Sequence, residues 1–231
     1  NKAKNYDEYV AALKYWVAPA QNIVFASTKG DIALWIQGLF PNKWEGQGKF
    51  VMDGSKSEND WQSFIPQQFN AHTKNPERGF VSSANQHPVD EAYPYFVFND
   101  GYEAYRNRVI NDFFNSKEKL SVQDFKDLQN NNYNLKAAEL MPYMLETMDI
   151  SNQTAAEKEI YKIAKKWQYN NDMEEVGPSI WEAWWNVLYD MVWDEFDVKA
   201  TALNTPFTYQ TIYLLKNKGN DSFMDILKTK E

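Results

Sequence analysis

The stretch from Asn75 to Phe96 contains the residue types best suited to chemistry in this chain. Asn75-Pro76 predicts a turn, and Phe80–Ala84 has the composition of a short strand. That strand should end at Asn85, because Gln86-His87-Pro88 cannot continue a ladder. An Asn at the carboxyl end of a strand, beside a rigid turn, holds its side-chain amide in a fixed position. Such an amide can donate a hydrogen bond to a developing oxyanion.

A local role for Asn85 is the alternative. An Asn before a turn most often bonds its own backbone, and the residues taken alone favour that interpretation. The sequence pattern therefore makes Asn85 a candidate and leaves the choice open.

Arg106 is the second candidate. Asp100 and Glu103 have the spacing of a capping box, which predicts a helix from there to about Asn115. Arg106 would lie in the middle of the apolar face of that helix, where a charge needs a partner carboxylate or anion. An Arg that extends along the edge of the core to a surface Glu is equally compatible with the pattern.

Composition excludes several other chemistries. The chain has no cysteine and only two histidines, His72 and His87, so thiolate chemistry and a histidine-rich metal centre are excluded. No Gly-x-Ser-x-Gly elbow is present. The formal net charge of −8 and the absence of a long apolar run argue against nucleic-acid and membrane partners.

The elements expected to position these residues change character along the chain. The first part should contain a helix over 5–17, a hairpin of strands 22–27 and 31–37 around Lys29-Gly30, and a long loop from Pro41 to Ala71. We expect the aromatic residues of that loop to pin it to the scaffold. From residue 99 onward the pattern is helical. The expected helices begin near Leu120 with a Ser121 cap, then span 135–148, 156–167 and 179–196, with one or two more after Pro206. The fold class is therefore α+β, divided into a strand-bearing part, 1–98, and a helical region, 99–231.

Several motifs occur in an order that matches one family. Asn75-Pro76 with Gly79, then Asn85 with Pro88, then Tyr93-Pro94 form the most specific group. The other matching segments are Asn22–Ile32, Gly38–Pro41, Asp53-Gly54, Asp60–Pro66, Tyr105–Ile110 and Leu128-Gln129. Together, over roughly residues 5 to 195, they resemble the heavy chain of the penicillin acylase (penicillin amidase) family of N-terminal-nucleophile hydrolases.

This resemblance implies a fold and a chemistry. Residues 1–98 would belong to an αββα hydrolase core, followed by the all-helical region. Asn85 matches the family's oxyanion-hole asparagine, and Arg106 matches the arginine that positions this Asn and the charged end of the substrate. The family's nucleophile is a Ser at the first residue of the heavy chain, and its free α-amine takes the proton. Tyr95-Phe96-Val97 stand where the family has a calcium-binding Asp, so we predict no metal and no cofactor.

The resemblance also implies what lies outside this chain. Asn1 is no amide-cleaving nucleophile, so we expect an internal fragment of an acylase, inactive by itself, whose partners are the light chain, the rest of the heavy chain and a small N-acyl substrate. Such a substrate could be an acyl β-lactam, an acyl-homoserine lactone or a lipopeptide. A periplasmic or secreted location follows only from the family. The alternatives are a catalytically silent, ligand-binding member of the same fold and an independent aromatic-rich helical binding domain.

Overall fold

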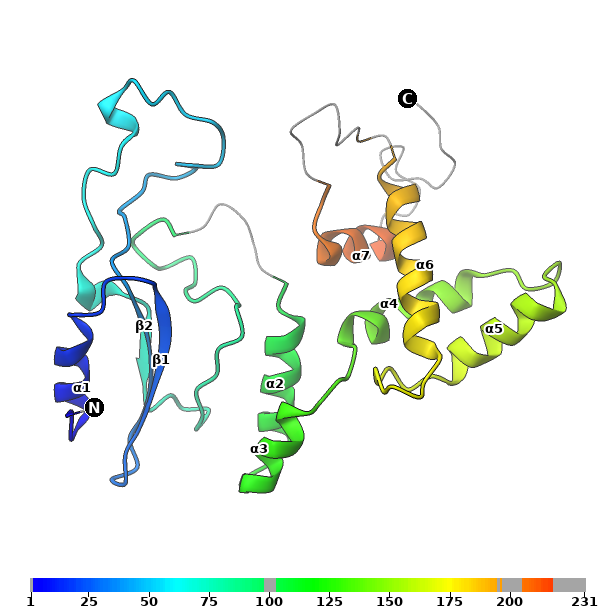
Figure 1. The fold of residues 1–231 in the computed structure, drawn as a ribbon, viewed down its shortest axis with the longest axis horizontal. Helices are drawn as coiled ribbons and strands as arrows, with labels where there is room; N and C mark the ends of the chain where they lie inside the picture. Colours follow the sequence, from blue (N-terminus) through cyan, green and yellow to red (C-terminus); the bar gives the residue numbers. More distant parts are fainter. Residues whose placement is uncertain (1, 98–102, 195, 197–204, 218–231) are drawn as a thin grey trace. The chain divides into compact units, whose positions relative to one another are not determined.

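The chain folds into two compact units in the computed structural model, Asn1–Lys119 and Leu120–Glu231 (Figure 1). The structure describes residues 2–97, 103–194, 196 and 205–217. The first helix beyond the sheet, α2 (Tyr105–Asn115), lies in the first unit. The expected division of the hydrolase core near residue 98 stays a prediction, since residues 98–102 lie outside the described residues.

Helix α1 (Tyr6–Leu13) opens the first unit and is shorter than the predicted 5–17. Asn5 caps it, because its side chain accepts a hydrogen bond from the backbone N–H of Glu8 at 2.9 Å. The helix ends at Leu13. Beyond it, the carbonyl of Trp16 accepts from Gln37 Nε2 at 3.0 Å, so this carbonyl is tied to the sheet and not to a further helical turn.

Three antiparallel strands follow in the order β1 (Gln21–Ala26), β2 (Ile32–Gln37) and β3 (His72–Lys74). The predicted β1–β2 hairpin is confirmed, with Gly30 at φ +93° in its turn. Strand β3 was not predicted, because its polar sequence resembles a loop. It forms because β2 offers a second edge for pairing and because the His72 ring stacks on Trp35 with centroids 4.1 Å apart.

The predicted strand at Phe80–Ala84 is wrong. This segment forms no ladder among the described residues. Its serines are held by side chains instead: Ser82 Oγ donates to Asn111 Oδ1 at 2.7 Å, and Asn22 Nδ2 donates to Ser83 Oγ at 2.7 Å. The segment is thus fixed by side-chain hydrogen bonds, which alternation of residue types does not reveal.

A small aromatic core joins α1 to the sheet. It consists of Tyr9, Leu13 and Trp35, with four half-buried apolar residues around them: Tyr6, Val10, Ile23 and Phe25. The Tyr9 hydroxyl donates to the carbonyl of Ile23 at 2.8 Å, and burial, with a smaller effect of Tyr6, raises the Tyr9 pKa to about 12. The core therefore fixes β1 against α1 by packing and by one buried hydroxyl.

The long loop from Pro41 to Ala71 has two short 3₁₀ turns, η1 (Ser57–Asn59) and η2 (Gln67–Phe69). Its aromatic residues are exposed, so the expectation that they pin the loop is wrong; they are Trp44, Phe50, Trp61 and Phe64. Buried amides hold the loop instead. Asn70 Nδ2 donates to the carbonyl of Gly38 at 3.2 Å, which ties the loop to the end of β2. Gln47 Nε2 donates to the carbonyl of Asn59 at 3.1 Å, so the loop also bonds to itself, as compact surface loops do.

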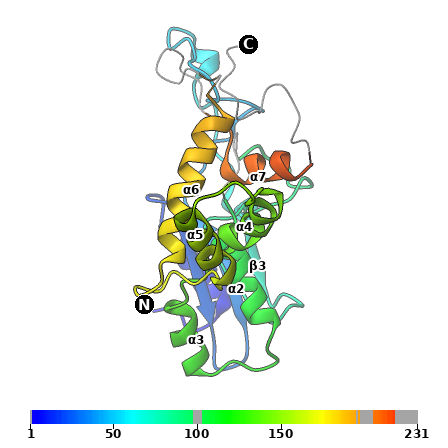
Figure 2. The ribbon, with the colours of Figure 1, turned by 90° about the vertical axis from the view of Figure 1, so that its right-hand side faces the viewer.

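The second unit is helical. Its elements are α3 (Val122–Gln129), α4 (Leu135–Thr147), α5 (Ala155–Lys166), α6 (Gly177–Val192) and α7 (Thr208–Asn217). Capping boxes begin α3 at Ser121 and α5 at Thr154. Helix α5 packs against both α4 and α6 (Figure 2). Four of these helices lie close to the predicted ranges.

Two helix starts differ from the predictions. Helix α6 begins at Gly177-Pro178, two residues before the predicted start at 179, because Pro is well accepted in the first turn. Helix α2 begins at Tyr105, so Glu103 precedes it and the proposed capping box is wrong; Asp100 lies outside the described residues. After Pro206 the described residues contain α7.

Helix α6 buries one side. Trp181 and Trp185 are buried and stacked with centroids 5.6 Å apart, whereas Val187 is 59% exposed. The other side of the helix is therefore uncovered among the described residues. Among all the residues that the structure describes, no helix combines the length and the apolar character required to cross a membrane.

Candidate active site

Asn85 lies at a tight turn in the first unit with its backbone at φ +61°. This left-handed region is costly for most residues, but Asn tolerates it. Gln86 supports the turn: its Oε1 accepts from the N–H of Ala84 at 2.7 Å and its Nε2 donates to the carbonyl of Ser82 at 3.4 Å. Gln86 thus makes the local backbone bonds that are the alternative role for Asn85.

The side chain of Asn85 is oriented by Arg106. The guanidinium Nη2 of Arg106 donates a hydrogen bond to Asn85 Oδ1. Because a guanidinium can only donate, this contact identifies the oxygen of the amide and leaves Nδ2 on the other side. Among the described residues Nδ2 has no acceptor, and the Asn85 side chain is exposed. The amide is held through its oxygen, and its N–H donor is open to a ligand. An oxyanion site requires a donor that is fixed and accessible in this way.

Arg106 occupies the first turn of α2 and is exposed, so its predicted place in the middle of a buried apolar face is wrong. The residues that α2 buries are Asn107 and Phe114. No carboxylate in the described part of the chain pairs with Arg106, so neither a buried ion pair nor a surface Glu explains it. A cation at a helix N-terminus opposes the helix dipole. Arg106 is therefore poorly placed to stabilise α2 and well placed to hold Asn85 and an anionic group.

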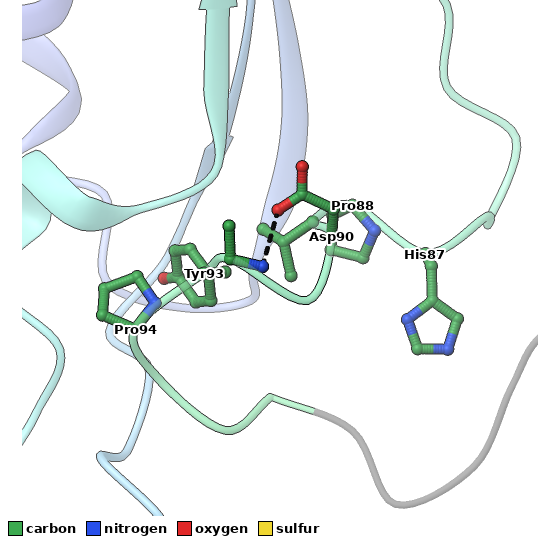
Figure 3. Close-up of a pocket in the computed structure, with 7 residues that line it drawn as sticks. His87, Pro88, Asp90, Tyr93 and Pro94 are labelled. Atoms are coloured by element: carbon green, nitrogen blue, oxygen red, sulfur yellow. Dashed lines mark hydrogen bonds between the residues drawn. The ribbon is translucent and has the colours of Figure 1, made fainter.

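A shallow pocket of about 460 Å³ adjoins this turn. It is lined by His87, Pro88, Val89, Asp90, Ala92, Tyr93 and Pro94 (Figure 3). Asp90 Oδ1 accepts from the N–H of Ala92 at 3.1 Å, and the Tyr93 hydroxyl donates to the carbonyl of Phe69 at 2.8 Å. Burial, and then the neighbouring Tyr95, raises the pKa of Tyr93. These bonds fix the loop that follows Asn85, as the figure shows for Asp90.

Metal-binding chemistry finds no support in this region. No three His, Asp or Glu side chains of the described residues gather as they would around a metal ion. Tyr95, Phe96 and Val97 contribute no side-chain carboxylate where the family resemblance places one. The described residues of this region therefore do not fit a calcium ion.

A larger cavity of about 640 Å³ lies in the second unit, between α5 and α6. Its walls are mainly apolar, with Ile160, Trp184 and Val187 among them, and Glu157 contributes a carboxylate to the lining. The Glu157 carboxylate accepts hydrogen bonds from Thr154, which lower its pKa. This carboxylate is thus engaged in capping α5.

Comparisons with known proteins agree on one family. A family model described as penicillin amidase matches residues 1–231. The acyl-homoserine lactone acylase QuiP of Pseudomonas syringae pv. tomato is 30% identical over 89 residues, and QuiP of Pseudomonas aeruginosa is 25% identical over 140 residues. These matches cover 38% and 61% of this chain but 11% and 16% of those proteins. The chain therefore corresponds to a small part of the curated relatives it matches.

The fold has a solved counterpart. A thermostable penicillin G acylase from Alcaligenes faecalis superposes with a TM-score of 0.65 at 15% sequence identity, covering 83% of this chain and 36% of that chain. At this identity the likeness shows the fold alone. It confirms the α+β, N-terminal-nucleophile hydrolase architecture predicted from the sequence.

Proposed function

Because this chain belongs to the penicillin amidase family, we propose that residues 1–231 are part of an acylase that hydrolyses a linear amide bond. Asn85 supplies a hydrogen-bond donor to the oxyanion of the tetrahedral intermediate. Arg106 positions Asn85 and binds the charged end of the substrate. The observation that carries this proposal is the Arg106–Asn85 hydrogen bond, which leaves Nδ2 of Asn85 open to the outside.

The remaining chemistry comes from elsewhere in the parent protein. Neither Asn85 nor Arg106 can act as nucleophile or base at neutral pH. We assign both roles to a Ser at the start of a heavy chain, outside residues 1–231, whose α-amine has an ordinary pKa of about 7.7 to 8.0. This amine takes the hydroxyl proton as the Ser oxygen attacks the amide carbon, and the proton then passes to the leaving amine.

The names of the relatives support the proposed substrate class. The curated relatives are acyl-homoserine lactone acylases, and the solved counterpart is a penicillin G acylase. Both names describe removal of an acyl group from an amide nitrogen. We therefore propose a small N-acyl compound as substrate, an acyl-homoserine lactone or an acyl β-lactam, with residues 1–231 inactive by themselves.

The test uses the full-length parent protein. Intact-mass measurement and N-terminal sequencing should find two chains, the heavier one beginning at a Ser upstream of residue 1. Asn85→Gly then removes the amide while accepting the positive φ. It should lower kcat on the order of 10² to 10³, the usual cost of one oxyanion donor.

A second variant, Asn85→Asp, separates loss of the N–H donor from loss of the contact with Arg106. The carboxylate keeps an oxygen for Arg106 and loses the N–H donor, so it should be as inactive as Asn85→Gly. Retention of kcat within a few-fold in both variants contradicts the proposed role of Asn85. An uncut, inactive protein that still binds N-acyl ligands establishes the silent member of the fold instead.

A further inference from the structure

Helix α2 holds the Asn85 turn at two separate points. Arg106 donates to Asn85 itself, and Asn111, farther along the same helix, accepts from Ser82 Oγ at 2.7 Å. Five residues of helix separate these two contacts by about 7.5 Å along the axis. One hydrogen bond lets a loop pivot about the contact, whereas two bonds at this spacing define its orientation.

The second contact is supported from within α2. Asn111 Nδ2 donates to Asn107 Oδ1 at 3.0 Å, and residues four apart share one helix face. Ser82 and Asn107 are buried, 7% and 8% exposed. Three polar side chains are thus linked in series in a largely buried place, where satisfied hydrogen bonds are strong and rigid. We refer to Ser82, Asn111 and Asn107 as the Ser82 chain.

The Ser82 chain reaches the turn on both sides of Asn85. Ser82 lies three residues before Asn85, and its carbonyl accepts from Gln86 Nε2, directly after Asn85. The backbone at Asn85 is in the left-handed region, which persists only where surrounding contacts determine it. The contacts that do so here are those of Arg106, Gln86 and the Ser82 chain.

We propose that the Ser82 chain sets the position of the oxyanion donor of Asn85. Its members touch no reacting atom, so they are positioning residues, and this role rests on the proposed function of Asn85. Loss of the Ser82 hydroxyl leaves Asn85 and Arg106 in place but allows the turn to rotate about the contact between them. Displacement of a donor by about 1 Å lowers catalysis markedly even when every reacting group remains.

The experiment uses the full-length, processed protein and an N-acyl substrate that it hydrolyses. Ser82→Ala should lower kcat about ten-fold and leave KM within about two-fold, because the donor acts on the transition state. Ser82→Thr keeps the hydroxyl and should retain most of kcat. Ser63→Ala is the matched control, since it also removes a serine partner of an asparagine side chain, Asn42, but in the long loop.

A double-mutant cycle separates positioning from general stability. If the Ser82 chain acts through Asn85, Ser82→Ala lowers kcat in the parent but has almost no further effect in Asn85→Gly. An equal fall in both backgrounds, or no fall in either, overturns the proposal. Should Ser82→Ala fail to fold, Asn111→Asp makes the same test: it keeps the acceptor for Ser82, loses the donor to Asn107, and should lower kcat several-fold. A parent protein without amidase activity overturns both the proposed function and this inference, whereas an active parent indifferent to these changes overturns the inference alone.

Discussion

The two units of this chain differ in how many polar side chains they bury. Among the described residues, five of the six buried polar side chains belong to the first unit: Gln37, Gln47, Asn70, Ser82 and Asn107. The second unit contributes one, Thr211, together with most of the buried apolar residues. Four of those are tryptophans, namely Trp167, Trp181, Trp185 and Trp193.

This difference separates two physical tasks. Hydrogen bonds are directional, so a network of buried amides and hydroxyls specifies where each atom lies at small net gain in stability. Burial of apolar area is non-directional and contributes most of the free energy of folding. The first unit, which holds the candidate site, is built to fix geometry, and the second is built to be stable. Substitutions in the first should therefore alter activity more than stability, and those in the second the reverse.

The largest expected effect is on stability and falls in the second unit. Trp181 is fully buried on α6, and Trp181→Ala should lower the free energy of unfolding by about 3 to 5 kcal/mol. Trp181→Phe should cost much less, because it also removes an Nε1–H that has no partner among the described residues. Urea denaturation followed by circular dichroism measures both. Unchanged stability of Trp181→Ala would contradict the assignment of stability to the apolar burial of the second unit.

The next effect concerns the start of α6. A Cβ added to Gly177 would lie 2.2 Å from Cγ of the Trp167 side chain. The start of α6 and the end of α5, where these residues lie, could not keep their spacing. Gly177→Ala should cost about 1 to 3 kcal/mol. Gly54→Ala in the first unit is the control, since nothing lies within 4 Å of its added Cβ. Thermal melting of the two variants side by side gives the difference, and equal melting temperatures contradict the tight packing of Gly177 on Trp167.

Substitution of Arg106, in the first unit, should affect activity more than stability. Arg106→Leu should lower kcat about 10- to 100-fold, because Asn85 loses the contact that orients its amide. The free energy of unfolding should change by no more than about 0.5 kcal/mol, since the residue is exposed. The KM of a substrate with a carboxylate should rise more than that of a neutral one. Arg108→Leu, on the same helix, is the matched control, and a loss of stability as large as the loss of activity would place Arg106 with the structural residues.

The smallest effect concerns the cap of α5. Thr154→Ala removes the side chain that accepts from the N–H of Glu157 and should cost about 1 kcal/mol. The hydrogen bonds from Thr154 lower the pKa of Glu157. Stability from this carboxylate is therefore present above its unfolded pKa and is lost as the pH falls through the folded pKa. Denaturation of Thr154→Ala across acidic pH should show a weaker pH dependence than the parent, and an unchanged dependence argues against the cap.

Elements with strong local signals were predictable from the sequence. The β1–β2 hairpin has β-branched runs around Gly30, α3 begins at the Ser121 cap, and α5 has apolar residues at helical spacing, so short-range rules located them. Strand β3 and the irregular segment Phe80–Ala84 depend on partners far along the chain. Pairing with β2 made a strand of polar residues, and side chains from β1 and α2 replaced a ladder at Ser82 and Ser83.

The candidate site divides in the same way. Asn85 and Arg106 were found by resemblance and by residue type, and they are in contact in the structure. The Ser82 chain was missed, because serines and asparagines are common surface residues and carry no periodicity that marks them as joined. Ser82 and its partner Asn111 lie 29 residues apart in the sequence. Only the fold brings such a pair together.

The positive φ of Asn85 has a consequence for which sequences this position accepts. Gly, Asn and Asp are the residues that enter the left-handed region most readily. Of these three, Asn alone combines that backbone with a side-chain N–H donor. In a library of all twenty residues at position 85, selection for folding should enrich a group of three, and selection for turnover should then leave one. The backbone and the chemistry thus act as two successive filters that converge on the same amino acid.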